Sequence, residues 1–383
     1  MSQSDWEIGR VMGIPIRVHA SWFLVFLFMT WTLATGYLPE ALPGLTEERY
    51  WGMGAIAAIL LFCSVLVHEL GHSYVAKRYH IPIGQITLFL FGGVAQMGKE
   101  PPSPRAEFLI AIAGPIVSVL LGAVCLGLAA ASEVALTAAS AHGFVVLGGL
   151  LGMVNVQLGL FNLIPGFPLD GGRVLRAGLW RWSSDFARAT RQAAMFGLGF
   201  GLLFVAAGIG LIGGTVAGAI EDSAVGNGGW LIFIGAFLFV AARNARRHMA
   251  VLSALDGTAV REVMTTAMSP IAPALSLREA VDQYFVPQGG GGGPVVEDGQ
   301  VVGLITVEQV QAIPQGLWTW RTVREVMHPS APELFVAPDR SLKQALQQMG
   351  EADLERLVVL EEGKPIGVIT QAAIAQFLQL HQP

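Results

Sequence analysis

The segment SVLVHELGHSYVAKRYH, residues 64–80, places two histidines and a glutamate at the end of an apolar run. His68 and His72 are four residues apart, so on a helix both imidazoles project from one face and can bind the same metal ion. Glu69 follows His68 directly and can act as general base on a water that such an ion activates. A chance match in a packed helix is the alternative, but an unneutralised glutamate in a run of this length is costly. The segment is therefore a candidate zinc site.

A catalytic zinc site needs a third protein ligand and an open coordination position. The segment FNLIPGFPLDGGR, residues 161–173, follows another apolar run, and its two prolines break the helix before Asp170. If both runs cross a membrane in the same direction, Asp170 lies at the depth of His68 and His72, which makes it the candidate third ligand. A turn residue in the DGG sequence is the alternative role for this aspartate.

The composition limits the class of protein. Of the 383 residues, 53% are hydrophobic and only 13% are charged, which excludes an ordinary soluble protein and indicates an integral membrane protein. The net charge of −5 and the short, scattered basic clusters argue against a nucleic-acid partner. Both cysteines, Cys63 and Cys125, lie in apolar runs, so a disulfide framework and a cysteine zinc site are excluded. Zinc must use histidine and carboxylate ligands.

Six apolar runs are long enough to cross a bilayer as helices. They lie at about residues 21–37, 54–74, 106–131, 144–163, 193–219 and 228–242. Arginine and lysine gather before the first run, between the second and third, after the fourth and after the sixth, whereas the opposite segments carry acidic residues and only Arg49. By the positive-inside rule, both chain termini are expected in the cytoplasm. A cleaved signal peptide is the alternative for the first run.

Two segments between these runs have the composition of β-strands. VMGIPIRVHASW, residues 11–22, and IGQITLFLFGGVAQM, residues 83–97, are rich in Val, Ile, Phe and Thr. A strand at membrane depth needs protein or a water-filled cavity to satisfy its backbone. We therefore expect short strands beside the membrane and a cavity near the second run.

A repeat begins at about residue 258, where the composition becomes that of a soluble domain. VREVM occurs at residues 260–264 and again at 323–327, and GLIT at 303–306 is answered by GVIT at 367–370. The spacing predicts two copies of a unit of about 60 residues, each ending in a β-strand and a helix. The predicted copies cover residues 258–314 and 321–380.

Together these features resemble one known family. HELGH, FNLIPGFPLDGGR, the intervening LFGGVAQM and IAGPIVS, and the paired C-terminal module are similar to the site-2 protease family of intramembrane zinc metalloproteases. The similarity is greatest to its six-span bacterial and archaeal branch, which carries a pair of cystathionine-β-synthase-type (CBS) domains. The resemblance implies one Zn²⁺ per chain on His68, His72 and Asp170. It also implies Glu69 as general base, and Asn162 as the residue that holds the scissile carbonyl or its oxyanion.

The resemblance also implies a fold and a biological role. The expected fold is a polytopic α-helical membrane protein, with six transmembrane helices and short membrane-associated β-strands, plus an α/β cytoplasmic CBS pair. Residues 1–250 would form the transmembrane zinc metalloprotease domain, and residues 251–383 the tandem CBS domains. The chain would reside in the cell (inner) membrane and carry out regulated intramembrane proteolysis. Its partners would be the lipid bilayer and a single-span substrate, for example a membrane-anchored regulator.

Three details of the family pattern concern individual residues. Ser118 stands where the family usually carries an asparagine after its GP motif. The strand-forming ITLFLF, residues 86–91, is expected to hold an unwound substrate by strand addition. CBS pairs often bind adenine nucleotides, which makes Thr306 and Thr370 candidate phosphate or ribose contacts. The acidic residue usual three positions after each threonine is replaced by Gln309 and Ala373, so a dimerisation module without nucleotide is the alternative.

Two other function classes compete with a protease. A metal-ion transporter or channel gated by the CBS pair explains histidine and aspartate ligands within the membrane, but it has no need of a general base such as Glu69. A binding protein that has lost catalysis is opposed by the intact HExxH segment with a third ligand. Cleavage of a single-span test substrate separates these classes from a protease.

Overall fold

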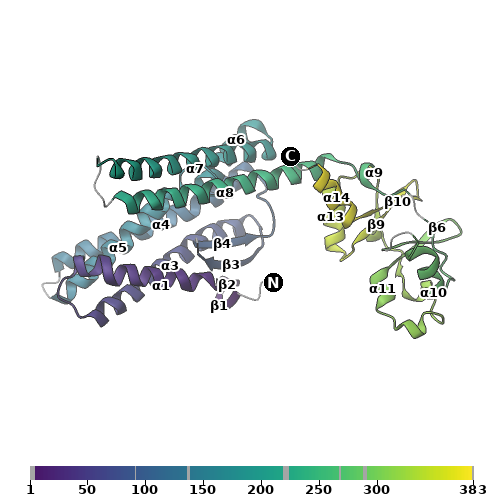
Figure 1. Ribbon diagram of the computed structural model, residues 1–383, viewed down its shortest axis with the longest axis horizontal. Helices are drawn as coiled ribbons and strands as arrows, with labels where there is room; N and C mark the ends of the chain where they lie inside the picture. The colour runs from purple at the N-terminus through teal and green to yellow at the C-terminus, as the bar shows by residue number, and fades with distance from the viewer. Residues whose placement is uncertain are drawn as a thin grey trace. The chain divides into compact units, whose positions relative to one another are not determined.

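The computed structural model describes residues 5–90, 92–135, 139–218, 224–266, 269–287 and 291–381 (Figure 1). Some predicted features fall partly outside these residues: Phe91 of ITLFLF, residue 219 at the end of the fifth run, and short parts of the first repeat. The chain divides into two compact units, Met1–Arg246 and Arg247–Pro383, here called the membrane unit and the repeat unit.

The described residues contain six helical segments long and apolar enough to cross a membrane, which confirms the six predicted spans. The first combines α1 (Ser21–Thr32), a π-helical turn (Leu33–Tyr37) and α2 (Leu38–Ala41). The others are α3 (Glu47–Arg78), α4 (Pro104–Ala135), α5 (Ala139–Asn162), α7 (Phe186–Val216) and α8 (Ala224–Gly257). A shorter helix, α6 (Asp170–Ser183), connects α5 to α7 and packs against α4 and α7.

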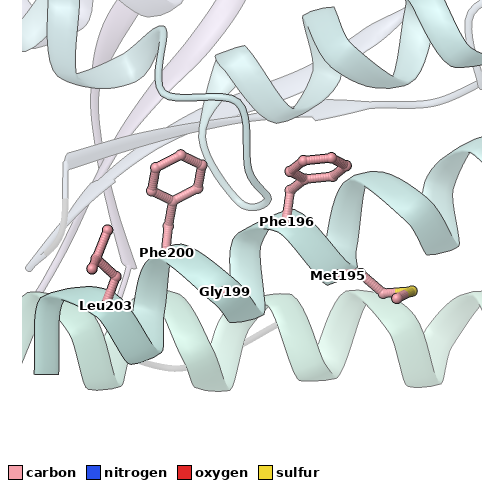
Figure 2. A pocket seen from close by; sticks show the side chains of 5 residues that line it. All are labelled: Met195, Phe196, Gly199, Phe200 and Leu203. Carbon is pink, nitrogen blue, oxygen red and sulfur yellow. The ribbon is translucent and has the colours of Figure 1, made fainter. Parts of the chain in front are cut away.

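Helices α7 and α8 lie side by side (Figure 1) because glycines allow their backbones to touch. A Cβ atom at Gly201 would lie 2.8 Å from the backbone nitrogen of Phe239, and one at Gly235 would lie 2.6 Å from the carbonyl oxygen of Gly201. Figure 2 shows an apolar hollow along α7, lined by Met195, Phe196, Gly199, Phe200 and Leu203. Exposed apolar side chains of this kind suit a surface in contact with lipid.

Four strands beside the helices form one sheet in the order β1-β2-β3-β4, which confirms strands in the predicted segments 11–22 and 83–97 and adds β1 before the first of them. They are β1 (Asp5–Val11), β2 (Ile14–His19), β3 (Ile83–Phe89) and β4 (Gly92–Met97). Ile14, Ile16 and Ile86 are buried against Leu66 and Leu70 of α3. Strand β3 pairs with β2 on one side and with β4 on the other. The expectation that ITLFLF accepts a substrate strand is therefore wrong; β4, paired on one side within the described residues, offers its free edge.

The repeat unit contains two three-stranded sheets. One consists of β5 (Gly292–Glu297), β6 (Gln300–Thr306) and β7 (His328–Pro329), and the other of β8 (Phe335–Val336), β9 (Arg356–Glu361) and β10 (Lys364–Thr370). The α-helices of this unit are α9 (Val260–Val263), α10 (Leu277–Ala280), α11 (Val307–Gln311), α12 (Val323–Val326), α13 (Leu342–Glu351) and α14 (Gln371–Leu380). A π-helical turn (Val281–Phe285) and two 3₁₀ turns (Gln315–Leu317 and Pro332–Leu334) complete it.

The two copies exchange their VREVM segments. Val260, from the first copy, is buried in a core with Leu342 of the second, and its backbone nitrogen donates to Arg340 O at 2.8 Å. Val323, from the second copy, is buried in the core of the first, and its backbone nitrogen donates to Leu275 O at 2.9 Å. Each copy therefore completes its core with a segment of the other.

Candidate metal centre

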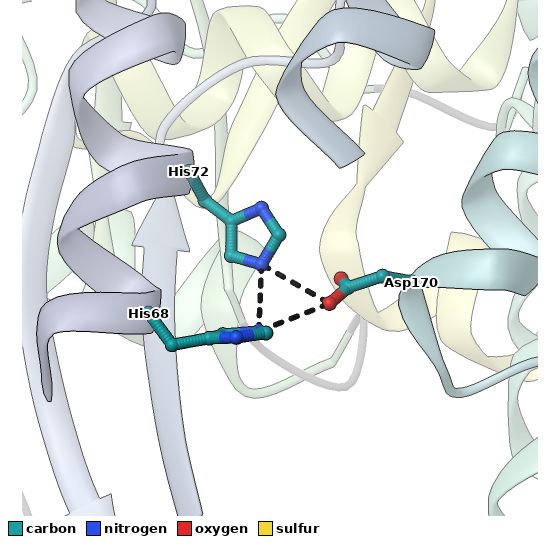
Figure 3. A group of neighbouring side chains, drawn as sticks. All are labelled: His68, His72 and Asp170. Atoms are coloured by element: carbon teal, nitrogen blue, oxygen red, sulfur yellow. Dashed lines mark hydrogen bonds and ion pairs between the residues drawn. The ribbon is translucent and has the colours of Figure 1, made fainter. Parts of the chain in front are cut away.

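Three residues singled out by the sequence meet in the membrane unit (Figure 3). His68 and His72 project from α3, and Asp170 reaches them from the first residue of α6. The Asp170 Oδ2 atom lies 3.1 Å from Nε2 of His68 and 3.1 Å from Nε2 of His72. The two Nε2 atoms are themselves 3.1 Å apart. The structure thus joins two helices that lie about a hundred residues apart in sequence, His68 and Asp170 being separated by 102 positions.

The local sequence explains how these side chains are presented. Residues four apart on α3 lie on the same face, and this face is buried, so the side chains of His68 and His72 are only 5% and 4% exposed. Helix α5 ends at Asn162, and the proline-containing segment then turns the chain so that α6 begins at Asp170. Asp170 is therefore the first residue of a helix, where the helix dipole favours a negative charge.

Helix α4 orients both imidazoles through their second nitrogen atoms. Nδ1 of His72 lies 2.7 Å from the carbonyl oxygen of Ile110, and Nδ1 of His68 lies 2.9 Å from Oγ of Ser118. Because a carbonyl oxygen only accepts hydrogen bonds, Nδ1 of His72 carries the proton, and Nε2 of the neutral ring presents its lone pair to the site. Contacts of this type fix the tautomer and orientation of metal-binding histidines. Ser118 fills this role at the position where the sequence departs from the family pattern.

The donor set fits Zn²⁺. Lone pairs of a carboxylate oxygen and of imidazole nitrogen atoms repel one another at 3.1 Å unless a cation or a proton lies between them. Around a tetrahedral zinc ion with bonds of about 2.1 Å, neighbouring ligand atoms are about 3.4 Å apart. The observed spacing is close to this value, and two imidazoles with one carboxylate are a ligand set of catalytic zinc sites. His68, His72 and Asp170 are the residues that would hold the ion.

Gly114 on α4 leaves the space that the donor atoms need. A Cβ atom at this position would lie 2.6 Å from Nε2 of His68 and closer still to Nε2 of His72. Any side chain larger than hydrogen would therefore enter the centre. The sequence signal for this contact was the IAGPIVS segment, although its helix could not be placed against α3 from sequence alone.

Glu69 lies beside the free-edge strand of the sheet. A Cβ atom at Gly93 of β4 would lie 2.5 Å from Cγ and 3.4 Å from Oε1 of Glu69. The glutamate therefore packs directly against β4, next to its own neighbour on α3, His68. A carboxylate in this place lies next to a metal ligand and against β4, the strand whose other edge can pair with an extended chain.

Asn162 is the last residue of α5, eight positions before Asp170, and is half-buried. Its side chain makes no hydrogen bond to other residues in the part of the chain that the structure describes. The structure therefore brings together the histidine pair and the aspartate and sets Glu69 beside them, while Asn162 is placed only by its position at the end of α5.

One buried group at the centre was not identified from the sequence. Glu107, in the first turn of α4, is fully buried and accepts a hydrogen bond from Arg173 of α6 at 3.1 Å and another from Arg176. Glu107 is the one charged residue in the apolar run of residues 106–131, and an isolated charge in such a run is a signal that could have revealed it.

In the repeat unit, the candidate nucleotide contacts have local partners. Oγ1 of Thr306 accepts from the backbone nitrogen of Gln309 at 3.4 Å, and Oγ1 of Thr370 accepts from that of Ala373 at 3.0 Å, so both threonines cap helices. The side chain of Gln309 accepts from Thr306 N and donates to Val326 O, both at 2.9 Å. The side chain of Gln309, which replaces the expected acidic residue, therefore already has hydrogen-bond partners within the repeat unit.

Comparison with known proteins gives matches to both units. The family model for peptidase family M50 matches residues 56–206, and the model for the CBS domain matches residues 323–380. The Rip3 protein of Mycobacterium tuberculosis, named as a zinc metalloprotease, is 32% identical over 98% of this chain and 93% of its own length. The zinc metalloprotease MJ0392 of Methanocaldococcus jannaschii is 32% identical over 98% and 96%. A solved site-2 protease from the same archaeon is 34% identical, covering 63% of this chain and 95% of that one with a TM-score of 0.43.

These similarities extend along nearly the whole chain and agree with the enzyme class expected from the sequence. They do not support the alternative of a metal-ion transporter or channel. The CBS match covers the second predicted copy, and the exchanged VREVM segments relate the first copy to it. The chain belongs to peptidase family M50, the site-2 protease family of intramembrane zinc metalloproteases, and carries a C-terminal CBS domain.

Proposed function

We propose that this protein hydrolyses a peptide bond in or near the transmembrane segment of a single-span membrane protein, such as a membrane-anchored regulator. His68, His72 and Asp170 are the ligands of one Zn²⁺ per chain. The observation that carries this assignment is the convergence of two imidazole lone pairs and one carboxylate oxygen, 3.1 Å apart, at a buried point. Such a set of donors is costly to bury without a cation among them.

The chain's own residues divide the chemical work. When bound, Zn²⁺ supplies a Lewis acid that polarises the carbonyl group under attack and makes water more acidic. Glu69 takes the proton from the attacking water and returns it to the nitrogen atom of the leaving amine. Asn162 donates an amide N–H to the substrate oxygen as negative charge develops on it, an interaction that is stronger in a water-poor site.

The substrate is held in extended form at β4. The peptide bonds of a helix are shielded and hydrogen-bonded, so a transmembrane helix must unwind before its backbone can be attacked. Pairing with the free edge of β4 replaces the lost hydrogen bonds. Because Gly93 of β4 packs against Glu69, a paired substrate strand lies close to the general base.

The membrane arrangement follows from the distribution of basic residues. Both termini face the cytoplasm in the cell (inner) membrane, since the segments rich in arginine and lysine lie on the side of the termini. Both α3 and α5 then run inward, so the metal centre is reached from the cytoplasmic half of the membrane. Labelling of a cysteine introduced at Ala131 from outside intact cells, with protection of one at Ser184, is the expected result.

The repeat unit regulates cleavage and does not perform it. Residues 1–250 form the protease domain and residues 251–383 a tandem CBS pair, through which two chains associate as a homodimer. Binding of an adenine nucleotide at Thr306 and Thr370 is the alternative to a pair that only dimerises. The hydrogen bonds by which both threonines cap helices weigh against nucleotide binding. A ligand of the pair shifts activity only if it prefers one arrangement of the two copies.

The proposed function is tested with purified protein in liposomes that also contain a single-span substrate. We expect specific cleavage that stops when a chelator removes zinc and returns when zinc is restored. Cleavage that continues with less than one zinc ion per ten chains would overturn the assignment. Zinc flux across the same liposomes, without cleavage, would instead favour transport.

A further inference from the structure

A buried ion-pair cluster joins α4 to α6 next to the metal centre. Oε1 of Glu107 accepts a hydrogen bond from Nε of Arg173 at 3.1 Å and another from the guanidinium of Arg176. The Glu107 side chain is completely buried, and the side chains of Arg173 and Arg176 are 17% and 12% exposed. Removing one member of such a buried cluster leaves an uncompensated charge, which costs far more than the loss of an exposed ion pair.

The cluster lies one turn away from the centre on both helices. Glu107 precedes Ile110, whose carbonyl oxygen orients His72, by three residues on α4. Arg173 follows Asp170 by three residues on α6. Since three to four residues make one turn of a helix, the ion pair and the groups of the centre occupy successive turns of the same two helices. A shift of α6 along α4 would therefore move Asp170 relative to His72.

Helix α6 packs on α4 and α7, but among its described polar contacts the ion pair with Glu107 is the one made to α4. Oδ2 of Asp170 lies 3.1 Å from Nε2 of each imidazole, and these donor atoms are the groups that α6 must align. The guanidinium of Arg176 lies 5.0 Å from the ring centre of Phe167 and 4.6 Å from that of Phe186, so aromatic contacts hold it together with the carboxylate. A guanidinium held in this way has little freedom to follow a displaced carboxylate, so the ion pair restrains α6 relative to α4.

The cluster is poorly designed for stability alone. Among the described residues, Oε2 of Glu107 and Nε of Arg176 are buried without a hydrogen-bond partner. Apolar side chains of similar volume would stabilise the contact between two helices as well or better than an incompletely satisfied ion pair. An ion pair also fixes the position of α6 along α4 and its rotation about its own axis. A metal ligand on α6, such as Asp170, requires both.

We infer that Glu107 is a positioning residue of the metal centre: it holds Arg173 and Arg176 so that the first turn of α6 presents Asp170 to His68 and His72. This inference rests on the ligand assignment of the proposed function. The described polar contacts of the Glu107 side chain are to Arg173 and Arg176, not to the donor atoms. Its effect is on metal affinity and coordination geometry, and through them on cleavage.

The test compares Glu107→Gln with Arg181→Gln in the full-length protein. Glu107→Gln removes the charge with little change of shape, and Arg181→Gln, at an exposed arginine of α6, is the control for loss of a charge outside the cluster. Zinc retention is measured by titration with a chelator, and the visible spectrum is recorded after substitution with Co²⁺. We expect Glu107→Gln to lower zinc affinity roughly 10–100-fold and to change the cobalt spectrum, as loss of an outer partner of a metal ligand does. Arg181→Gln should match the wild-type protein.

Two further variants make the outcome decisive. Arg173→Gln leaves Arg176 to neutralise Glu107, so it tests the same contact if Glu107→Gln does not fold; we expect it to lower zinc affinity as well. A folded variant of either kind with unchanged zinc affinity and cobalt spectrum would overturn the positioning role. Asp170→Asn reports on the ligand assignment itself. If Asp170→Asn keeps zinc, the proposed function fails; if it loses zinc while Glu107→Gln keeps it, only the present inference fails.

Discussion

The metal centre and the capped threonines of the repeat unit use polar side chains in opposite ways. In the membrane unit, His68, His72 and Asp170 come from two helices and direct their donor atoms at one another. In the repeat unit, Thr306 and Thr370 direct their hydroxyl groups at the backbone three residues ahead. An isolated polar group in an apolar helix has few hydrogen-bond partners nearby, so its presence indicates a metal-binding or catalytic role. A threonine before a helix has an immediate structural use.

The two units also differ in how they bring distant segments of the chain together. The membrane unit brings distant segments to one site through helix packing, whereas the repeat unit exchanges equivalent segments between its copies. A change at the metal centre should therefore alter chemistry and leave the fold, and a change in the repeat unit should alter stability and leave the chemistry. Substitutions at the metal centre, in the exchanged segments and at the capping threonines test this contrast.

Glu69→Gln should have the largest effect. The substitution removes the general base but none of the proposed metal ligands, so we expect cleavage to fall by about 10²–10⁴-fold with zinc still bound. Initial cleavage rates of the liposome-bound substrate and zinc content per chain are the two measurements. His68→Ala is the matched control, because it should lose zinc together with activity. Normal cleavage by Glu69→Gln would contradict the mechanism.

Gly114→Ala should come next. The added methyl group would lie 2.6 Å from Nε2 of His68, so α4 or the imidazoles must move and zinc binding must weaken. We expect a loss of roughly 10–100-fold in zinc affinity, similar to that produced when outer partners of metal ligands are removed. Gly127→Ala, on the same helix with no atom within 4 Å of the added carbon, is the control. Equal zinc affinities in the two variants would show that the centre tolerates a side chain at Gly114.

Val260→Ala and Val323→Ala test the exchange of segments. Each buried valine should contribute roughly 1–3 kcal/mol, since truncation leaves a cavity in the core. Because Val260 packs in the core of the second copy, limited proteolysis of Val260→Ala should cut first around β9 and α13. Val323→Ala should cut first around β5 and β6. Zinc content should stay unchanged in both, and cuts confined to each valine's own copy would contradict the exchanged arrangement.

Sequence reasoning reached the parts of this protein that depend on composition and short spacing. Six apolar runs of sufficient length predict six spans, and the four-residue spacing of His68 and His72 determines a shared helix face. The depth of Asp170 followed from the direction of two spans. These features need no knowledge of which helices are neighbours.

What the sequence could not provide is the choice of neighbours. Ile110 and Ser118 lie 38 and 50 positions from the histidines that they orient, and nothing local connects them. The wrong expectation for ITLFLF has the same origin, because the order of strands in the sheet decides which edge is free. Strand β3 pairs with β2, although the helices α1 to α3 separate the two strands in the sequence. The exchanged VREVM segments are likewise a long-range outcome, since each repeat looks complete in sequence.

Thr306→Val should have the smallest effect, and it bears most directly on the contrast between the units. Loss of the cap should destabilise the repeat unit by about 1 kcal/mol, as for other helix caps, and Thr370→Val should do the same at α14. Zinc content and basal cleavage should not change; if either falls, the threonines are not merely structural.

The pH dependence of the same variant provides a second measurement. Hydrogen bonds from its own backbone N–H and from the Thr306 hydroxyl hold the pKa of Glu308 below its ordinary value. A carboxyl group whose pKa is lower in the folded state stabilises the fold above the unfolded pKa, and this contribution is lost as the pH falls through the folded value. Thr306→Val should therefore lose less stability on acidification than the wild-type protein or Thr370→Val. Thermal unfolding of the repeat unit within the full chain, between pH 7 and pH 4, measures the difference. An identical acid-side loss in all three proteins would show that the Thr306 hydroxyl does not bond Glu308.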